Sequence, residues 1–283
     1  MDAPRYDRRS WSGDEIRARQ KAGAPEIAPV IRTFATEQHG DFFARLPLAF
    51  VAGLDAAGRP VASLLRGAPG FIALAEPRRM EIAARFPECE PLTREMDEPF
   101  GVIGMDFAAR RRNRVNGRIV VAESGRLTIS VEEAFGNCPK YIAPRDLFSG
   151  EGDPGAWRVL PAVDAEARAL IEGSDIFFVA TRGADGIDMS HRGGPPGFVR
   201  LTPEGELAIP DFRGNNYFNT FGNLLHDPRA ALLFVDFPRG RVLHLQGVAR
   251  VDFSPVRSWS FAPENASLLM FETALGSASG VAP

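Results

Sequence analysis

The 283-residue sequence has little cysteine, with only Cys89 and Cys138. The two lie far apart without a CxxC spacing, so the sequence contains neither a zinc-binding pattern nor a disulfide framework, and we predict no metal site. So little cysteine is typical of a reducing compartment. Acidic neighbours disfavour a Cys89 thiolate, and no histidine and aspartate set accompanies Cys138, so we expect neither thiol to be a nucleophile.

Long hydrophobic runs and a strong charge of one sign are also missing. The longest apolar runs have the length of strands, well short of a membrane span, and the polar N-terminus lacks the apolar core of a secretory signal. The formal net charge of −3 argues against a dedicated nucleic-acid binder. We therefore expect a cytoplasmic protein with small-molecule partners and with no nucleic-acid or membrane partner.

Lysine is scarce as well, because Lys21 and Lys140 are the only lysines among 33 basic residues. A biased genome explains abundant arginine, so arginine content by itself says nothing about function, but Lys140 becomes notable. The hydrophobic content of 45% is enough for two globular lobes, each with a core of its own.

Two lobes are also indicated by a long internal repeat. Residues 62–71 align without a gap on residues 189–198, at an offset of 127 residues, and an apolar stretch precedes each copy. Residues 113–119 resemble residues 243–249 at an offset of 130. Solenoid repeats are much shorter, so this period predicts two related lobes.

Short strands and hairpin turns dominate the predicted elements. In the first half we expect helices over 13–22 and 29–44, and strands over 48–54, 61–65, 71–75, 100–107, 118–122 and 127–131. In the second half we expect a helix over 165–172, strands over 175–181, 188–192, 198–201 and 207–209, a helix from about 215 to 225, and a hairpin of 230–237 with 241–253. This pattern predicts a mainly β protein of two closed antiparallel barrels with flanking helices.

The predicted domain organisation follows from the repeat and from composition. We expect a polar N-terminal extension over 1–30, a first lobe over 31–145, a linker over 146–162, a second lobe over 163–253 and a C-terminal tail over 254–283. The linker is placed where glycine, proline and acidic residues dominate.

A polar loop in the second half is the strongest candidate for a binding site. It contains Arg213, Gly214, Asn215, Asn216 and Asn219 just before a predicted helix. A glycine beside an arginine at a helix start suits an anion such as phosphate, and Asn219 lies about one turn after Asn215 on the same face. The alternative is a polar helix start capped by asparagine, and we favour the phosphate cradle.

Two strands present further polar candidates. Ser190 and Arg192 share one face of a predicted strand while His191 points to the other, and Gly193 follows. Gln246 lies on another strand and could contact a polar ring. The alternatives are a solvated hairpin end for the first strand and an exposed barrel face for Gln246.

Candidates from the first lobe could complete the site. Arg114 and Asn116 share a strand face, and Asn116 matches Gln246 in the repeat. Asn137, Lys140 and Tyr141 follow the first lobe and could close over a ring or a phosphate. The alternative for these three is a structural turn set by Pro139.

Three motifs together resemble the pyridoxamine 5′-phosphate oxidase-like flavin-binding split barrels. They are Ser-His-Arg-Gly-Gly-Pro-Pro-Gly-Phe at 190–198, Pro-Asp-Phe-Arg-Gly-Asn-Asn-Tyr-Phe-Asn at 210–219 and Asp-Pro-Arg-Ala-Ala-Leu-Leu-Phe at 227–234. Phe-Gly-Asn-Cys-Pro-Lys-Tyr-Ile at 135–142 resembles a motif of the tandem, two-lobed branch, and the resemblance spans about residues 36–253. It implies split β-barrels, FMN bound in a cleft between barrels, and a homodimer.

The first lobe departs from this pattern. Residues 76–86 look like an ordinary amphipathic helix without an N-terminal glycine, so we expect one phosphate cradle per chain, with Arg213 as its main cation. The first lobe would then form one wall of a shared cleft, within one chain or across a dimer.

The resemblance implies an FMN-dependent oxidoreductase that takes a small-molecule substrate or electron donor. The flavin carries the redox chemistry, so catalytic side chains stay unassigned. The alternatives are a flavin carrier or sensor without turnover, and a split barrel that uses a deazaflavin or haem.

Overall fold

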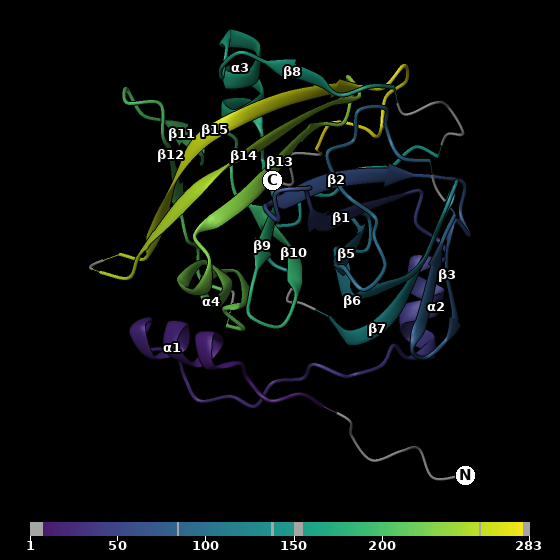
Figure 1. Cartoon of the computed structure of the whole chain (residues 1–283). Helices are drawn as coiled ribbons and strands as arrows, with labels where there is room; N and C mark the ends of the chain where they lie inside the picture. Colours follow the sequence, from purple (N-terminus) through teal and green to yellow (C-terminus); the bar gives the residue numbers. More distant parts are fainter. Residues whose placement is uncertain are drawn as a thin grey trace.

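The structure is a computed structural model that describes residues 8–83, 85–136, 139–149, 155–214, 216–254 and 256–279. It consists of two antiparallel sheets that lie side by side, with four helices among the described residues around them (Figure 1). No helix in the described ranges is long and apolar enough to cross a membrane.

The first sheet is formed by the first half of the chain. Its strands are β1 (Leu48–Leu54), β2 (Pro60–Arg66), β3 (Ile72–Glu76), β4 (Arg79–Ile82), β5 (Pro99–Asp106), β6 (Arg111–Glu123) and β7 (Arg126–Gly136). Their order in the sheet is β2-β1-β5-β6-β7-β4-β3.

The second sheet repeats this order. Its strands are β9 (Ile176–Arg182), β10 (Ile187–Gly193), β11 (Arg200–Leu201), β12 (Leu207–Pro210), β13 (Arg229–Asp236), β14 (Arg241–Asp252) and β15 (Ser258–Met270), and a short β8 (Arg158–Leu160) pairs with β15. The order β10-β9-β13-β14-β15-β12-β11 confirms that the two apolar strands of the repeat hold equivalent places. Each sheet ends at two open edges, which confirms the split barrels that the resemblance implies. The closed barrels expected from the strand pattern are wrong.

Two of the helices begin after a residue whose side chain caps the first turn, Ser12 and Asp164. The described helices are α1 (Gly13–Lys21), α2 (Glu37–Phe43), α3 (Ala165–Gly173) and α4 (Asn219–His226). The predicted capping box of α1 is present, because Ser12 Oγ accepts from the Glu15 amide at 3.2 Å and Glu15 accepts from the Ser12 amide at 2.8 Å. Helix α1 lies against α4, so the N-terminal segment runs beneath both lobes (Figure 1).

Four predicted elements differ from the structure. The helix over 76–86 is wrong, because β3 and β4 form a hairpin there whose alternating residues Met80 and Ile82 are buried. The helix expected over 29–44 is limited to α2, since Arg32 is extended and pairs with Ala134 of β7. The helix expected from residue 215 begins at Asn219. Residues 258–270, expected in a tail, form β15, whose Trp259 and Phe261 are buried.

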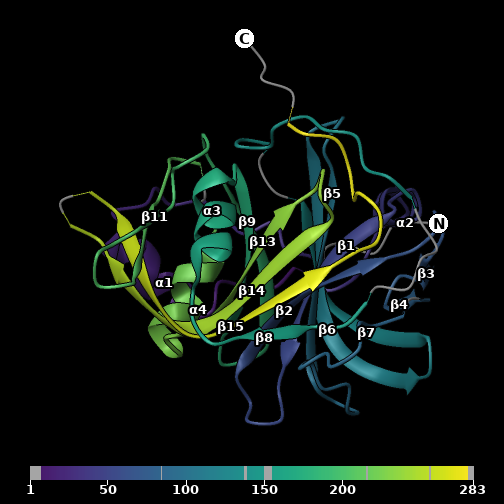
Figure 2. The same cartoon turned by 90° about the horizontal axis from the view of Figure 1, so that it is seen from above.

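The two lobes pack on each other as matching halves. Phe50 of β1 stacks on Phe178 of β9 with ring centroids 3.5 Å apart, and these residues occupy the same register position in their sheets. One apolar core contains residues of both lobes around this pair. Seen from above, β1 and β2 of one lobe face β9 and β13 of the other (Figure 2). The packing therefore relates the lobes by an approximate twofold axis.

A buried histidine at the interface between the lobes should make the stability of the protein sensitive to acid. His244 Nε2 accepts from the Ala62 amide at 3.3 Å, and burial, its largest influence, lowers the pKa of His244 to about 4. The folded state then binds fewer protons than the unfolded state below pH ~6.5, so stability is complete above that pH and is lost as the pH falls towards 4.

We expect His244→Gln to reduce this acid sensitivity by up to about 2 kcal/mol at pH ~5. Urea unfolding of the wild type and the variant near pH 7 and pH 5 measures the difference. Parallel losses of stability in the two proteins would show that His244 does not cause the effect.

Candidate functional site

A cleft between the lobes brings together seven of the fifteen predicted site residues. We call it the interlobe cleft; it is lined by Arg112, Arg114, Lys140, Tyr141, His191, Arg192, Gly193, Phe198, Pro210, Asp211, Phe212 and Gly214. Strand β6 and the turn after β7 supply the first-lobe wall, and β10 and the loop after β12 supply the other. Both walls belong to one chain.

Two glycines let the turn over residues 139–142 close against the second lobe. A Cβ added at Gly193 would lie 2.2 Å from the Tyr141 carbonyl oxygen, and one at Gly214, whose φ is +139°, would lie 3.1 Å from Lys140 Cδ. The Tyr141 hydroxyl donates to the Arg213 carbonyl at 2.7 Å, and its ring stacks on Phe212. The turn is therefore fixed to the second lobe by close backbone packing.

The interlobe cleft is electropositive. Arg112, Arg114, Lys140 and Arg192 line it, and its one acidic lining residue, Asp211, is ion-paired with Arg257. An excess of cationic side chains around a confined space attracts anions.

Arg192 is the most informative residue of the cleft, because two of its donors lack an acceptor among the described residues. Its Nη1 donates to the His191 carbonyl at 3.0 Å, whereas Nε and Nη2 are buried without an acceptor among the described residues. Burial lowers the pKa of Arg192, and Asp211 opposes this effect. Buried donors without a partner cost about 1–3 kcal/mol each, so an anion that accepts from Nε and Nη2 would remove this cost.

His191 is a neutral group in this cleft. Burial, followed by the positive charges of Arg112 and Arg192, lowers the pKa of His191 well below its ordinary value. Arg112 forms a hydrogen bond with the Nδ1 atom of His191. The imidazole can therefore form hydrogen bonds near neutral pH but cannot contribute a positive charge.

Several predicted residues lie elsewhere. Ser190 Oγ accepts from Arg114 Nη2 at 2.9 Å behind the cleft, and Asn116 faces a neighbouring pocket. Asn219 is buried and donates to Glu15 of α1, contrary to the prediction that it faces a ligand.

The predicted phosphate loop is also arranged differently from expectation. Arg213 is exposed and is not one of the residues that line the cleft, and Asn216 is exposed while its carbonyl accepts from Arg19. Asn137 and Asn215 lie outside the described residues. Of the predicted loop, Gly214 is the residue that reaches the cleft.

Gln246 does not line the interlobe cleft and lies instead at the symmetry-related position between the lobes. Its amide donates to Asp55 at 3.2 Å and to the Pro60 carbonyl at 3.0 Å, both in the first lobe. That position is filled, since Ser63 and Trp157 both donate to the buried Glu90 carboxylate. The counterpart of the interlobe cleft thus holds an acid and an indole where the cleft itself holds cations.

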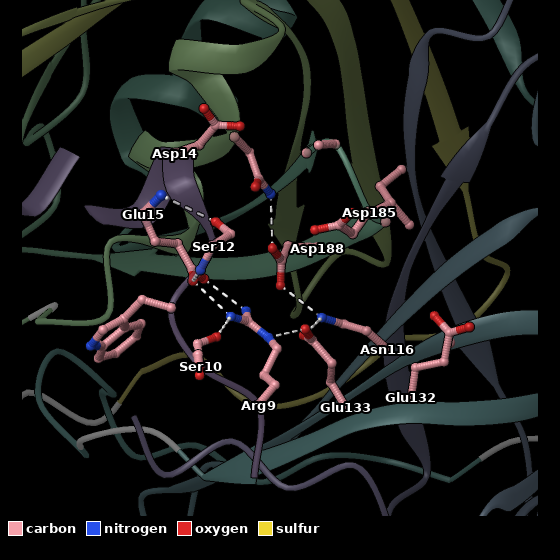
Figure 3. Close-up of a pocket in the computed structure, with 17 residues that line it drawn as sticks. Arg9, Ser10, Ser12, Asp14, Glu15, Asn116, Glu132, Glu133, Asp185 and Asp188 are labelled. Carbon is pink, nitrogen blue, oxygen red and sulfur yellow. Dashed lines mark hydrogen bonds and ion pairs between the residues drawn. The ribbon is translucent and has the colours of Figure 1, made fainter. Parts of the chain in front are cut away.

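A second pocket adjoins the interlobe cleft and was not predicted. We call it the acidic pocket (Figure 3); it encloses about 370 Å3 and its charged lining residues are Arg9, Asp14, Glu15, Glu132, Glu133, Asp185 and Asp188. The ion pair of Arg114 with Asp188, 2.9 Å long, lies between the two spaces. This pocket was not predictable from the sequence, because its N-terminal members reach it through tertiary packing alone.

The comparison with known families bears on the second lobe. Residues 163–259 match the family model described as pyridoxamine 5′-phosphate oxidase. The resemblance carried by the motifs is therefore confirmed for the second lobe.

Solved structures of single-lobed proteins are similar to part of the chain. A NimC/NimA family protein of Clostridium acetobutylicum is 15% identical over 40% of this chain and 91% of its own, with a TM-score of 0.31. The FAD binding protein of Mycobacterium smegmatis is 12% identical over 41% and 100%, with a TM-score of 0.30. HupZ of Group A Streptococcus is 19% identical over 42% and 98%, with a TM-score of 0.26. No curated protein matches the chain.

Proposed function

We propose that the chain binds one FMN in the interlobe cleft and acts as an oxidoreductase on a small molecule. The observation that carries the proposal is Arg192, whose Nε and Nη2 donors are buried without an acceptor among the described residues. It lies in the lobe that matches the pyridoxamine 5′-phosphate oxidase family model. A flavin phosphate is an anion of the kind that such donors bind.

The residues of the cleft fit the anionic end of FMN. The interlobe cleft encloses about 40 Å3, which suits a phosphate-sized group or a few waters. Arg192 and Lys140 would hold the phosphate, and Gly214 permits the close approach of the turn that carries Lys140. A groove of about 710 Å3 adjoins the cleft across Phe198 and Phe212, so larger groups have space beside the phosphate.

When bound, FMN would supply hydride or electron transfer at its isoalloxazine ring. The side chains of this chain bind and orient: the guanidinium of Arg192 and the ammonium of Lys140 compensate the phosphate charge. His191 stays neutral and limits the positive charge of the cleft. The stacked Tyr141 and Phe212 rings form an aromatic wall on one side of the cleft.

The cleft needs no second copy of the chain, because its two walls come from the two lobes. A homodimer is a separate proposal, which sedimentation of the purified protein tests. If the protein is monomeric and still binds FMN, the cleft is complete within one chain.

The proposal is tested by comparing FMN with riboflavin, which lacks the phosphate. We expect FMN to bind at least roughly tenfold more tightly, because only FMN can accept from the unpaired Arg192 donors. Fluorescence titration gives both affinities and a stoichiometry of one FMN per chain. Equal affinities would contradict a phosphate site, and flavin binding without turnover of NADH or NADPH would favour a carrier over an enzyme.

Lys140→Ala should weaken FMN binding by roughly two- to fivefold, less than the loss of a buried cation, because Lys140 is exposed and solvent screens its charge. The same titration measures the effect, with Lys21→Ala of α1 as the matched lysine control. Native affinity in Lys140→Ala would leave this lysine as a surface residue of the turn.

A further inference from the structure

The acidic pocket is a second candidate binding site, distinct from the interlobe cleft. It lies where β6, β7 and β10 meet the N-terminal segment that leads into α1 (Figure 3). We propose that the acidic pocket binds a small organic cation that carries a guanidinium or ammonium group.

The buried part of the pocket lacks one positive charge. Glu15 and Asp188 are 2% and 7% exposed, and Glu133 lies beside them. Arg9 binds Glu15 through two hydrogen bonds of 2.7 and 2.8 Å and also pairs with Glu133, while Arg114 pairs with Asp188. Three carboxylates therefore share two guanidinium groups.

The groups at the rim of the pocket do not supply the missing positive charge. Asp14 pairs with Arg17 and lies 3.3 Å from His226, and Glu132 pairs with Arg118 at 3.3 Å. Asp185 is exposed at the mouth and adds a further negative charge. A cation that enters the pocket thus passes a ring of acidic side chains before it reaches the buried ones.

The protonation of Glu133 reflects the missing charge. Burial, the largest influence, raises the pKa of Glu133 to about 7, and Asp188 raises it further although Arg9 and Asn116 act in the opposite direction. Near neutral pH Glu133 is therefore partly protonated. A ligand cation could compensate its charge in place of the proton.

The side-chain amide of Asn116 lies against the carboxylates of Glu133 and Asp188. It is 7% exposed, and its Nδ2 donates to Glu133 at 2.9 Å and to Asp188 at 2.8 Å, which directs the carboxamide into the cluster. Its buried Oδ1 has no donor among the described residues. That oxygen is turned towards Gly101 of β5, where an added Cβ would lie 3.2 Å from it, so the Nδ2 amide is the part of Asn116 that faces the carboxylates.

Arg9 demonstrates which chemistry the pocket accommodates. Its guanidinium lies between Glu15 and Glu133, with Ser10 O accepting from Nη1 at 2.9 Å (Figure 3). The pocket therefore already holds one planar cation from the chain itself, and about 370 Å3 remains for another. An external guanidinium would use the same carboxylates.

Agmatine, which has a guanidinium at one end and an ammonium at the other, is a suitable probe. Calorimetric titration of the flavin-free protein, above the pKa of Glu133 and at low salt, should show binding that butylurea, a neutral analogue, does not show. Glu133→Gln should weaken agmatine binding at least roughly tenfold, whereas Glu123→Gln, exposed at the end of β6, should not change it.

Arg9→Gln provides a second variant in case the loss of Glu133 disturbs folding. It removes the internal cation and should tighten agmatine binding by roughly tenfold, since two carboxylates lose their partner. Absence of agmatine binding to the wild type, equal binding by Glu133→Gln and Glu123→Gln, or no gain in Arg9→Gln would each overturn the proposal. Because no flavin is present, none of these outcomes depends on the FMN site.

Discussion

Replacing Arg192 with alanine is expected to weaken FMN binding by roughly ten- to a hundredfold. The guanidinium has two buried donors without an acceptor among the described residues, and a charge-assisted hydrogen bond in such a place contributes about 1.5–3 kcal/mol. The loss should fall on FMN and leave the affinity for riboflavin nearly unchanged, because riboflavin brings no phosphate to the cleft.

Arg213→Ala is the matched control for this experiment. The sequence alone favours Arg213 as the main cation, but its side chain is exposed in the structure, so its contribution should be screened by solvent. Fluorescence titration of both variants separates the two arginines. A larger loss of FMN affinity in Arg213→Ala than in Arg192→Ala would indicate that the phosphate binds at the loop of Arg213. It would contradict the assignment to Arg192.

Replacing Asp188 with alanine is expected to lower the free energy of unfolding by about 3–5 kcal/mol. Asp188 is 7% exposed and accepts from Arg114 at 2.9 Å and from Asn116 and Asn223 at 2.8 Å each. Its removal would leave the Arg114 guanidinium buried without a carboxylate, which is among the most costly single changes in a folded protein.

Urea unfolding measures this loss, and Asp185→Ala supplies the control. Asp185 lies three residues earlier in the chain and is exposed, so its removal should change stability by less than about 0.5 kcal/mol. If both variants unfold at the same urea concentration, the ion pair between the lobes is not the stabilising contact that its burial implies.

The two-lobed β architecture was predictable because the repeat and the strand pattern are local features. Residues 62–71 and 189–198 align directly, and they form β2 and β10 at the same place in each sheet. The hairpin of β3 and β4 was not predictable, because its arginines and alanines favour a helix in isolation and only the pairing of β4 with β7 makes it a strand. Strand β15 was missed for a similar reason, since polar residues alternate with its buried ones.

Several of the predicted residues come together because short segments determine their positions. Arg114, Lys140, His191 and Arg192 reach one cleft because their strands and the turn after β7 are brought together by the equivalent packing of the lobes. The position of α1 could not be predicted, because its contact with α4 joins segments about 200 residues apart. That contact turns Asn219 towards Glu15 and creates the acidic pocket.

The approximate twofold relation of the lobes explains why the sequence alone does not place Gln246. It is the counterpart of Asn116, and the sequence repeat cannot say which of two symmetry-related places carries a ligand. The structure distinguishes them by charge. Arg192 lies in one, and Glu90, hydrogen-bonded to Ser63 and Trp157, lies in the other.

A crystal structure of the protein grown with FMN tests the central claim most directly. The account predicts one flavin per chain, with its phosphate within hydrogen-bonding distance of Arg192 Nε or Nη2 and with the turn of Lys140 and Tyr141 beside it. A phosphate bound at the exposed Arg213, a flavin in the half that contains Glu90 and Gln246, or an empty interlobe cleft at saturating FMN would contradict it.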